Sequence, residues 1–175
     1  SLTAIPQLDT SSGTNFSSMF QGCYSLTAIP QLDTSSGTNF SSMFGNCYSL
    51  RYIDFVGYDF TSVTNANYRL TSTHTNGGSI MRIDNKFQMN TGGFTGAVMD
   101  APQWVSSTNL FYILVEDEQT MIPLGANATT VFTTSVYVYV VVPDSMYATY
   151  AADTYWATLG TRLKKRSEVT LPAWY

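Results

Sequence analysis

Few side chains of this 175-residue chain could carry out catalysis or bind a metal ion. The chain has two cysteines, Cys23 and Cys47, and one histidine, His74, whereas a zinc site needs more ligands than these. No nucleophile elbow accompanies His74, and the sequence contains no glycine-rich phosphate loop or dinucleotide motif. The sequence therefore predicts no catalytic residue, no metal ligand and no cofactor.

Acidic side chains offer the remaining chemistry. Glu116, Asp117 and Glu118 could bind Ca²⁺, and Asp54 with Asp59 could act as a catalytic pair on a glycan. We favour a structural role for these residues instead. Glu116, Asp117 and Glu118 would be the solvated end of a strand, and the aspartates would lie in turns. Identical repeats present the same residues twice, whereas catalysis needs a unique arrangement, so a polysaccharide-cleaving enzyme is the most distant function considered.

Tandem repeats must position any functional site in this chain. Residues 1–24 and 25–48 differ only in the two residues that precede each cysteine, and residues 49–72 are a third, diverged copy. This period falls within the range of leucine-rich repeats, roughly 20–29 residues. We therefore expect each repeat to form one coil of a solenoid whose short parallel strands stack about 4.8 Å apart.

Each coil is predicted to bury an apolar stripe. In the first coil, Leu2 and Ile5 lead into the strand, and Phe16, Met19 and Phe20 follow at the spacing of a short helical turn. One coil cannot bury this stripe alone, so the core must form between stacked coils.

The same stacking brings the two cysteines within disulfide range. Cys23 and Cys47 occupy equivalent positions of successive coils, where side chains point the same way. We therefore favour buried free thiols, acting as small hydrophobic side chains, over a disulfide.

The repeat itself resembles a known family. The sequence LTAIPQLDTSSGTNFSSMF, with a cysteine after two more residues, resembles the BspA-type leucine-rich repeats of bacterial surface proteins. The third copy, with Leu50, Ile53 and Asp54, is closer to their longer consensus, but it lacks the aromatic-Met-Phe stripe and the cysteine. We therefore expect the solenoid to end near residue 72.

The remainder of the chain has a different composition and is predicted to be an α+β capping domain over residues 73–175. The end of the chain, residues 139–168, resembles the closing segment that follows such repeats in bacterial surface proteins and in phage structural proteins. A cap would cover the exposed end of the solenoid. The expected elements are strands at 80–83, 94–98, 110–115 and 135–142, and a helix over about 144–165, within which Asp153 caps a second helical turn.

Composition narrows the class of partner. Only 11% of residues are charged and the net charge is −4, so binding to nucleic acid is not predicted. No apolar stretch reaches the roughly 18 residues of a membrane span, so membrane insertion is not predicted either. A surface rich in Ser, Thr, Asn and Tyr is typical of extracellular or virion proteins. The chain begins within a repeat, and we interpret it as part of a longer protein.

Together, the composition and the resemblance predict a non-catalytic surface recognition module. The favoured form is a phage tail-fibre or virion surface domain that binds a glycan or protein receptor on a host cell, with other fibre or virion chains as further partners. The alternative is a leucine-rich-repeat adhesin on the bacterial cell surface, and in a third hypothesis the coils are only a spacer. The candidate binding residues, all on the strand face, are Gln7, Gln31, Arg51, Tyr52 and Asp54.

Overall fold

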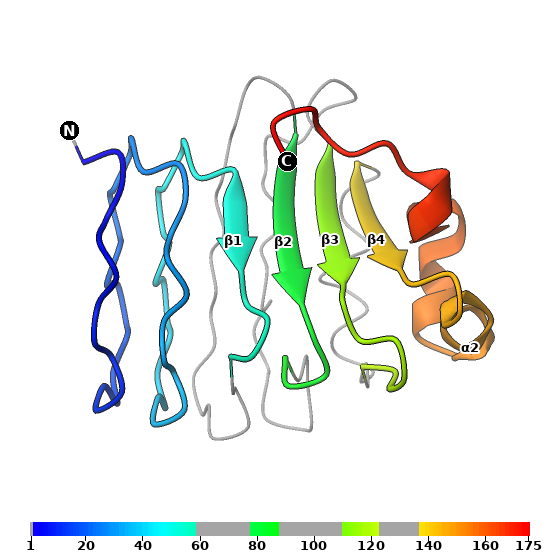
Figure 1. The fold of residues 1–175 in the computed structure, drawn as a ribbon, viewed down its shortest axis with the longest axis horizontal. Helices are drawn as coiled ribbons and strands as arrows, with labels where there is room; N and C mark the ends of the chain where they lie inside the picture. Colours follow the sequence, from blue (N-terminus) through cyan, green and yellow to red (C-terminus); the bar gives the residue numbers. More distant parts are fainter. Residues whose placement is uncertain (1, 59–77, 88–109, 123–136) are drawn as a thin grey trace.

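Parallel strands, ordered in space as they are in the sequence, form a single open sheet in the computed structural model (Figure 1). The model describes residues 2–58, 78–87, 110–122 and 137–175, so the predicted strand at 94–98, Asp59 and His74 lie outside the described residues. With its few helices the fold is an α+β mixture. The elements are β1 (Tyr52–Asp54), β2 (Ser79–Ile83), β3 (Phe111–Val115), β4 (Val138–Val142), α2 (Tyr147–Ala152), the 3-10 helix η1 (Trp156–Arg162), β5 (Leu163–Lys165) and the 3-10 helix η2 (Arg166–Glu168).

The first two repeats, which are nearly identical, stack against this sheet in the same parallel sense (Figure 1). The N–H of Thr27 donates to the carbonyl of Thr3 at 3.2 Å, and the N–H of Arg51 donates to the carbonyl of Thr27 at 3.1 Å. The row continues into β2, where the N–H of Ile80 donates to the carbonyl of Arg51 at 2.8 Å. An open sheet that grows from stacked repeats is compatible with the predicted solenoid, and β1 pairs with β2 across the predicted domain boundary at residue 72.

The helical turn predicted at Phe16, Met19 and Phe20 is wrong. Alternate N–H groups on this side of the first coil, including those of Phe16 and Phe20, donate to carbonyls of the second coil instead of to carbonyls of their own coil. Ser18 has φ +57°, a left-handed conformation that interrupts a right-handed helix. As a result Met19 is 39% exposed while the two phenylalanines are buried.

Identical side chains stack in ladders between the first two coils. The rings of Phe16 and Phe40 lie 5.1 Å apart and nearly parallel, and those of Phe20 and Phe44 lie 5.7 Å apart. The thiols of Cys23 and Cys47 are free, as favoured from the sequence. Burial raises the pKa of the Cys47 thiol to about 12, and its Sγ donates to the carbonyl of Phe20.

The helix predicted over about 144–165 is shorter and broken. Helix α2 has only six residues, and the last three residues of the predicted helix form β5. Asp153 adopts an extended conformation, and its Oδ1 accepts the N–H groups two and three residues further on, which starts η1. Gly160, at φ +54°, ends the helical geometry. No helix among the described residues is both long enough and apolar enough to span a membrane.

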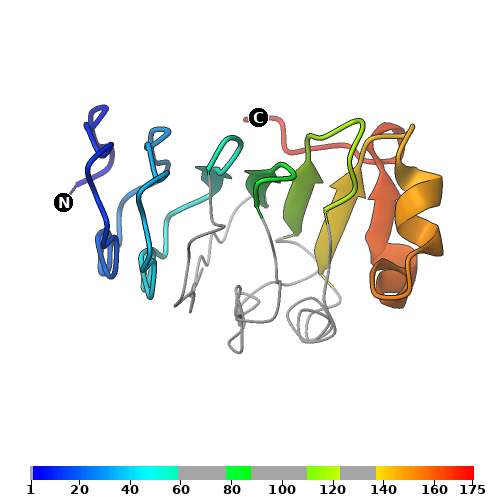
Figure 2. The same cartoon turned by 90° about the horizontal axis from the view of Figure 1, so that it is seen from below.

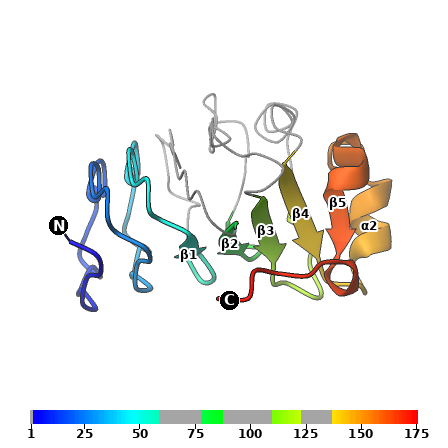
Figure 3. The same cartoon turned by 90° about the horizontal axis from the view of Figure 1, so that it is seen from above.

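The sheet has an apolar layer on each face, as parallel sheets usually do. The main core includes Ile53, Ile113 and Val140 and is continuous with the ladders of the repeats. On the opposite face a smaller cluster, formed by Ile80, Tyr112, Leu114 and Val141, is covered by residues 169–175, here called the C-terminal tail. Figure 2 and Figure 3 show this tail running back across the sheet from β5 towards β1.

Two buried tyrosines connect neighbouring coils in the same way. The hydroxyl of Tyr58 accepts the N–H of Leu32 at 2.8 Å, and the hydroxyl of Tyr150 accepts the N–H of Ile122 at 2.9 Å. Desolvation raises the pKa of each tyrosine to about 12. Each phenol satisfies a backbone donor that has no partner in its own coil.

We expect Tyr58→Phe to lower the free energy of unfolding by roughly 1–3 kcal/mol, because it leaves the buried N–H of Leu32 without its acceptor. Urea denaturation would measure the change. Tyr24→Phe, at an exposed tyrosine, is the matched control and should change stability by less than about 0.5 kcal/mol. Equal effects of the two variants would contradict the bridging role.

Stability should also fall at alkaline pH. Because folding raises the pKa of Tyr58 and Tyr150 from 10 to about 12, their contribution is complete below pH 10 and is lost as the pH rises from 10 to 12. Thermal unfolding followed at pH 9 to 12 would show this loss. The double variant Tyr58→Phe, Tyr150→Phe should be less stable at pH 9 and should lose less stability over that range.

Candidate functional site

A hollow of about 330 Å³ lies where the repeats meet the sheet and the C-terminal tail. It forms because outward-facing side chains change size from one coil to the next. Ala28 pairs in register with Tyr52, so a methyl group lies beside a large ring. The tail adds a wall on the other side. This surface, which we call the aromatic hollow, is lined by Thr27, Ala28, Arg51, Tyr52, Trp174 and Tyr175.

Arg51 brings a positive charge to the aromatic hollow. Its guanidinium carbon lies 5.0 Å from the centroid of the Trp174 ring, a cation–π contact. Among the described residues Arg51 takes part in no ion pair. Its charge is therefore available to a ligand.

Tyr52 provides an apolar wall whose position is fixed at both ends. Its ring lies 5.9 Å from the ring of Tyr175, and its hydroxyl donates to Oδ2 of Asp54 at 3.3 Å. Burial is the largest of the effects that raise the pKa of Tyr52, so the phenol stays neutral at physiological pH. The hollow thus keeps an uncharged aromatic wall beside its cation.

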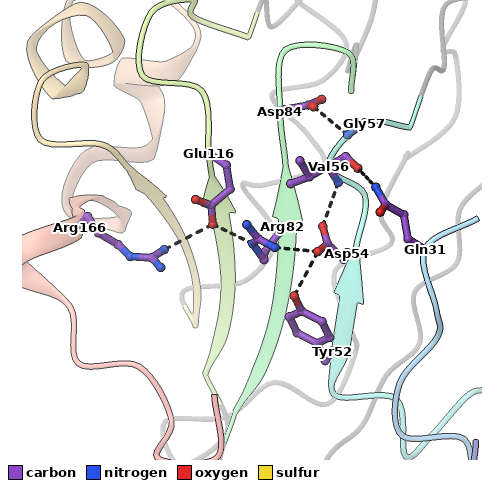
Figure 4. A network of polar contacts seen from close by, with 9 residues as sticks. All are labelled: Gln31, Tyr52, Asp54, Val56, Gly57, Arg82, Asp84, Glu116 and Arg166. Atoms are coloured by element: carbon purple, nitrogen blue, oxygen red, sulfur yellow. Dashed lines mark hydrogen bonds and ion pairs between the residues drawn. The ribbon is translucent and has the colours of Figure 1, made fainter.

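A charged network holds Tyr52 in this position (Figure 4). Arg82 of β2 bridges β1 and β3, with Nη1 at 2.7 Å from Oδ2 of Asp54 and Nε at 3.0 Å from Oε1 of Glu116. Nη1 of Arg166 lies 3.9 Å from the same oxygen of Glu116. Two cations thereby balance two carboxylates. Burial alone would lower the pKa of Arg82, but hydrogen bonds with Tyr52 and Glu116 and the nearby carboxylates outweigh it, so the pKa is raised.

The structure separates the predicted binding residues into two groups. Arg51 and Tyr52 line the aromatic hollow, whereas Asp54 lies in the charged network and also accepts the N–H of Val56 at 3.0 Å. Gln7 and Gln31 connect coils instead, because each side-chain amide donates to a backbone carbonyl one coil further on.

Sequence reasoning missed Trp174 and Tyr175. They lie more than 120 positions from Arg51 in the sequence, and no periodicity or motif connects them with the repeats. The only signal was the presence of two large aromatic side chains next to each other in a short apolar tail, which indicates packing but does not say against what.

Two of the three acidic residues that could have bound Ca²⁺, Glu116 and Asp117, are used in an ion pair and a turn. Asp117 Oδ1 accepts the N–H groups of Gln119 and Thr120, and Glu116 belongs to the charged network. In the described ranges of the chain, no three His, Cys, Asp or Glu side chains lie together as a metal site would require.

We expect Arg82→Gln to lower the free energy of unfolding at neutral pH by roughly 1–3 kcal/mol, because it leaves two half-buried carboxylates without their shared cation. Chemical denaturation would measure the change. Asp54→Asn should cost less in the Arg82→Gln background than in the wild type. Lys165→Gln, which breaks an exposed pair with Glu168, is the control and should cost less than about 1 kcal/mol.

Comparison with known families supports part of the interpretation drawn from the repeats. No curated protein and no solved structure matches the chain. The model of the family described as "Mycoplasma protein of unknown function, DUF285" matches residues 2–91, which include the three repeats and β2. The match does not reach the closing segment at residues 139–168. Because it covers more than half of the 175 residues, the chain belongs to the DUF285 family.

Proposed function

We propose that the protein is a non-catalytic recognition module of the bacterial cell surface that binds a receptor, glycan or protein, on another cell. The observation that carries this proposal is the aromatic hollow. It combines the Arg51 guanidinium, which has no ion pair among the described residues, with large aromatic side chains on one surface, and such residues are over-represented where proteins bind their partners. Tyr175 is half exposed there, so the hollow is open to a large ligand.

The family supports the cell surface as the location. DUF285 is related to BspA-like surface repeat proteins, and a weakly charged surface rich in hydroxyl and amide groups suits an extracellular protein. Nothing in the comparisons supports a phage tail fibre or a virion surface domain. We therefore propose the alternative that the sequence analysis gave, an adhesin on the bacterial cell surface.

The architecture supports recognition more than an active site. We propose that the repeats and the following strands form one leucine-rich-repeat solenoid, with α2 and η1 closing its far end. Parallel coils that stack at a fixed offset make an extended rigid surface, which repeat proteins use for binding. A spacer role alone would not require Arg51, which forms no ion pair with the described residues, to lie beside three aromatic side chains.

A pair of substitutions at equivalent positions tests the proposal. Ala28 is exposed and lines the aromatic hollow, so Ala28→Phe should fill it without removing a contact. Ala4 is the same residue one coil earlier and does not line the hollow. Ala4→Phe is therefore the matched control.

We expect the labelled protein to bind saturably to some members of a panel of bacterial and host cells. Ala28→Phe should weaken this binding at least tenfold, and Ala4→Phe should change it less than twofold, as measured by flow cytometry. Equal binding by both variants would contradict a role for the hollow. Binding that depends on the number of coils but not on Ala28 would favour recognition along the repeats instead.

A further inference from the structure

We propose that the aromatic hollow binds an acidic sugar, a pyranose ring that carries a carboxylate. This inference rests on the proposed function and names the chemical class of its ligand. It is based on the combination of charge, aromatic surface and hydroxyl groups that the hollow presents.

The distribution of charged residues indicates that the aromatic hollow would bind an anion. Arg82, Lys165 and Arg166 each form ion pairs with carboxylates of the chain, whereas Arg51 has only the Trp174 ring as a side-chain partner among the described residues. The chain as a whole is negative, with a net charge of −4. Arg51 is the cation that lines the aromatic hollow, and because it has no ion pair among the described residues a carboxylate can neutralise it.

The geometry of Arg51 leaves its hydrogen-bond donors available. Among the described residues the Arg51 guanidinium makes a cation–π contact with the Trp174 ring and no hydrogen bond or ion pair, so its N–H groups are not used within the described part of the chain. A planar fork of donors matches the two oxygens of a carboxylate. The tryptophan thus holds the side chain in place without consuming the groups that would bind the anion.

The rest of the hollow fits a sugar ring. Tyr52, Trp174 and Tyr175 offer aromatic surface to the C–H groups of a pyranose. The Thr27 hydroxyl donates to the carbonyl of Thr3 at 3.4 Å, and its oxygen can still accept a hydrogen bond from a sugar hydroxyl. The volume of about 330 Å³ is at the lower end of the range for small-ligand sites, roughly 300–1,000 Å³. One or two sugar units of a chain can therefore occupy it.

An acidic peptide fits less well. Extended peptides usually bind by adding backbone hydrogen bonds to a sheet. Here the N–H of Arg51 donates to Thr27 and its carbonyl accepts from Ile80, so the backbone of Arg51 has no unpaired group for a peptide. A peptide would have to bind through side chains alone.

Three probes separate the parts of this proposal. An oligogalacturonate carries both the ring and the carboxylate, its methyl ester keeps the ring without the charge, and poly-glutamate carries carboxylates without the ring. We expect calorimetry to detect binding of the oligogalacturonate, with weaker binding as salt is added, and at least tenfold weaker binding of the other two.

Substitution of Arg51 tests the role of the cation. Arg51→Gln should weaken oligogalacturonate binding about ten- to hundredfold, since a hydrogen-bonded charge is lost. Lys164→Gln removes the same charge from another cation–π pair, with Tyr139, and should change affinity less than twofold. Ala28→Phe, which keeps Arg51, should abolish binding by filling the hollow.

If the methyl ester bound as tightly as the oligogalacturonate, the proposed recognition of a carboxylate would be wrong. If poly-glutamate bound as tightly, the proposed recognition of a sugar ring would be wrong. Absence of oligogalacturonate binding would also overturn the proposal. In that case, loss of cell binding in Ala28→Phe would still support recognition through the hollow. If Ala28→Phe bound cells normally, the proposed function itself would fail.

Discussion

Parallel hydrogen bonding between coils is the constraint on which the rest of the structure depends. Backbone groups of Thr3, Thr27, Arg51 and Ile80 form one row, so each coil must offer its neighbour the same geometry. The constraint acts on the backbone and on the buried side chains, which stack as ladders of like residues. Exposed side chains are free to vary. A surface that occurs once in the solenoid, instead of once in each coil, therefore arises where an exposed row changes its residues.

Such a change occurs at the third coil. Along the outward row that passes through Ala28, Tyr52, Ile80 and Tyr112, the first residue is small and the following ones are large. The next row changes from Pro30 to Asp54, which brings a carboxylate into reach of Arg82. The same divergence that makes the third copy a poor match to the first two thus creates both the aromatic hollow and the charged network beside it.

How much the sequence could predict follows from the range of each interaction. The 24-residue period, the strands of β2 to β4 and the free thiols depend on local pattern, and these predictions agree with the structure within the described residues.

The helical turn predicted at Met19 is wrong because a spacing of three and four residues also arises when alternate backbone groups bond to the next coil. The cap predicted at Asp153 is confirmed, but a single helix over 144–165 is wrong, because Gly160 interrupts it through a backbone conformation that a pattern of apolar residues does not encode. The contact of Trp174 with Arg51 depends on the path of the C-terminal tail across the sheet, and no local pattern of residues determines that path.

The path of the C-terminal tail follows from the apolar side chains on one face of the sheet. In the repeats, the outward row holds small or polar side chains that water can solvate, and no cover is needed. From β2 onward the same face carries Ile80, Tyr112, Leu114 and Val141, whose exposure would be costly, and the tail covers them with Val169, Leu171 and Trp174. Along this path the tail reaches β1, where the ring of Tyr175 lies 5.9 Å from the ring of Tyr52. The last aromatic side chains of the tail therefore come to lie beside the first coil whose outward residues are charged, and the aromatic hollow forms at the boundary between the covered and the uncovered parts of one continuous sheet face.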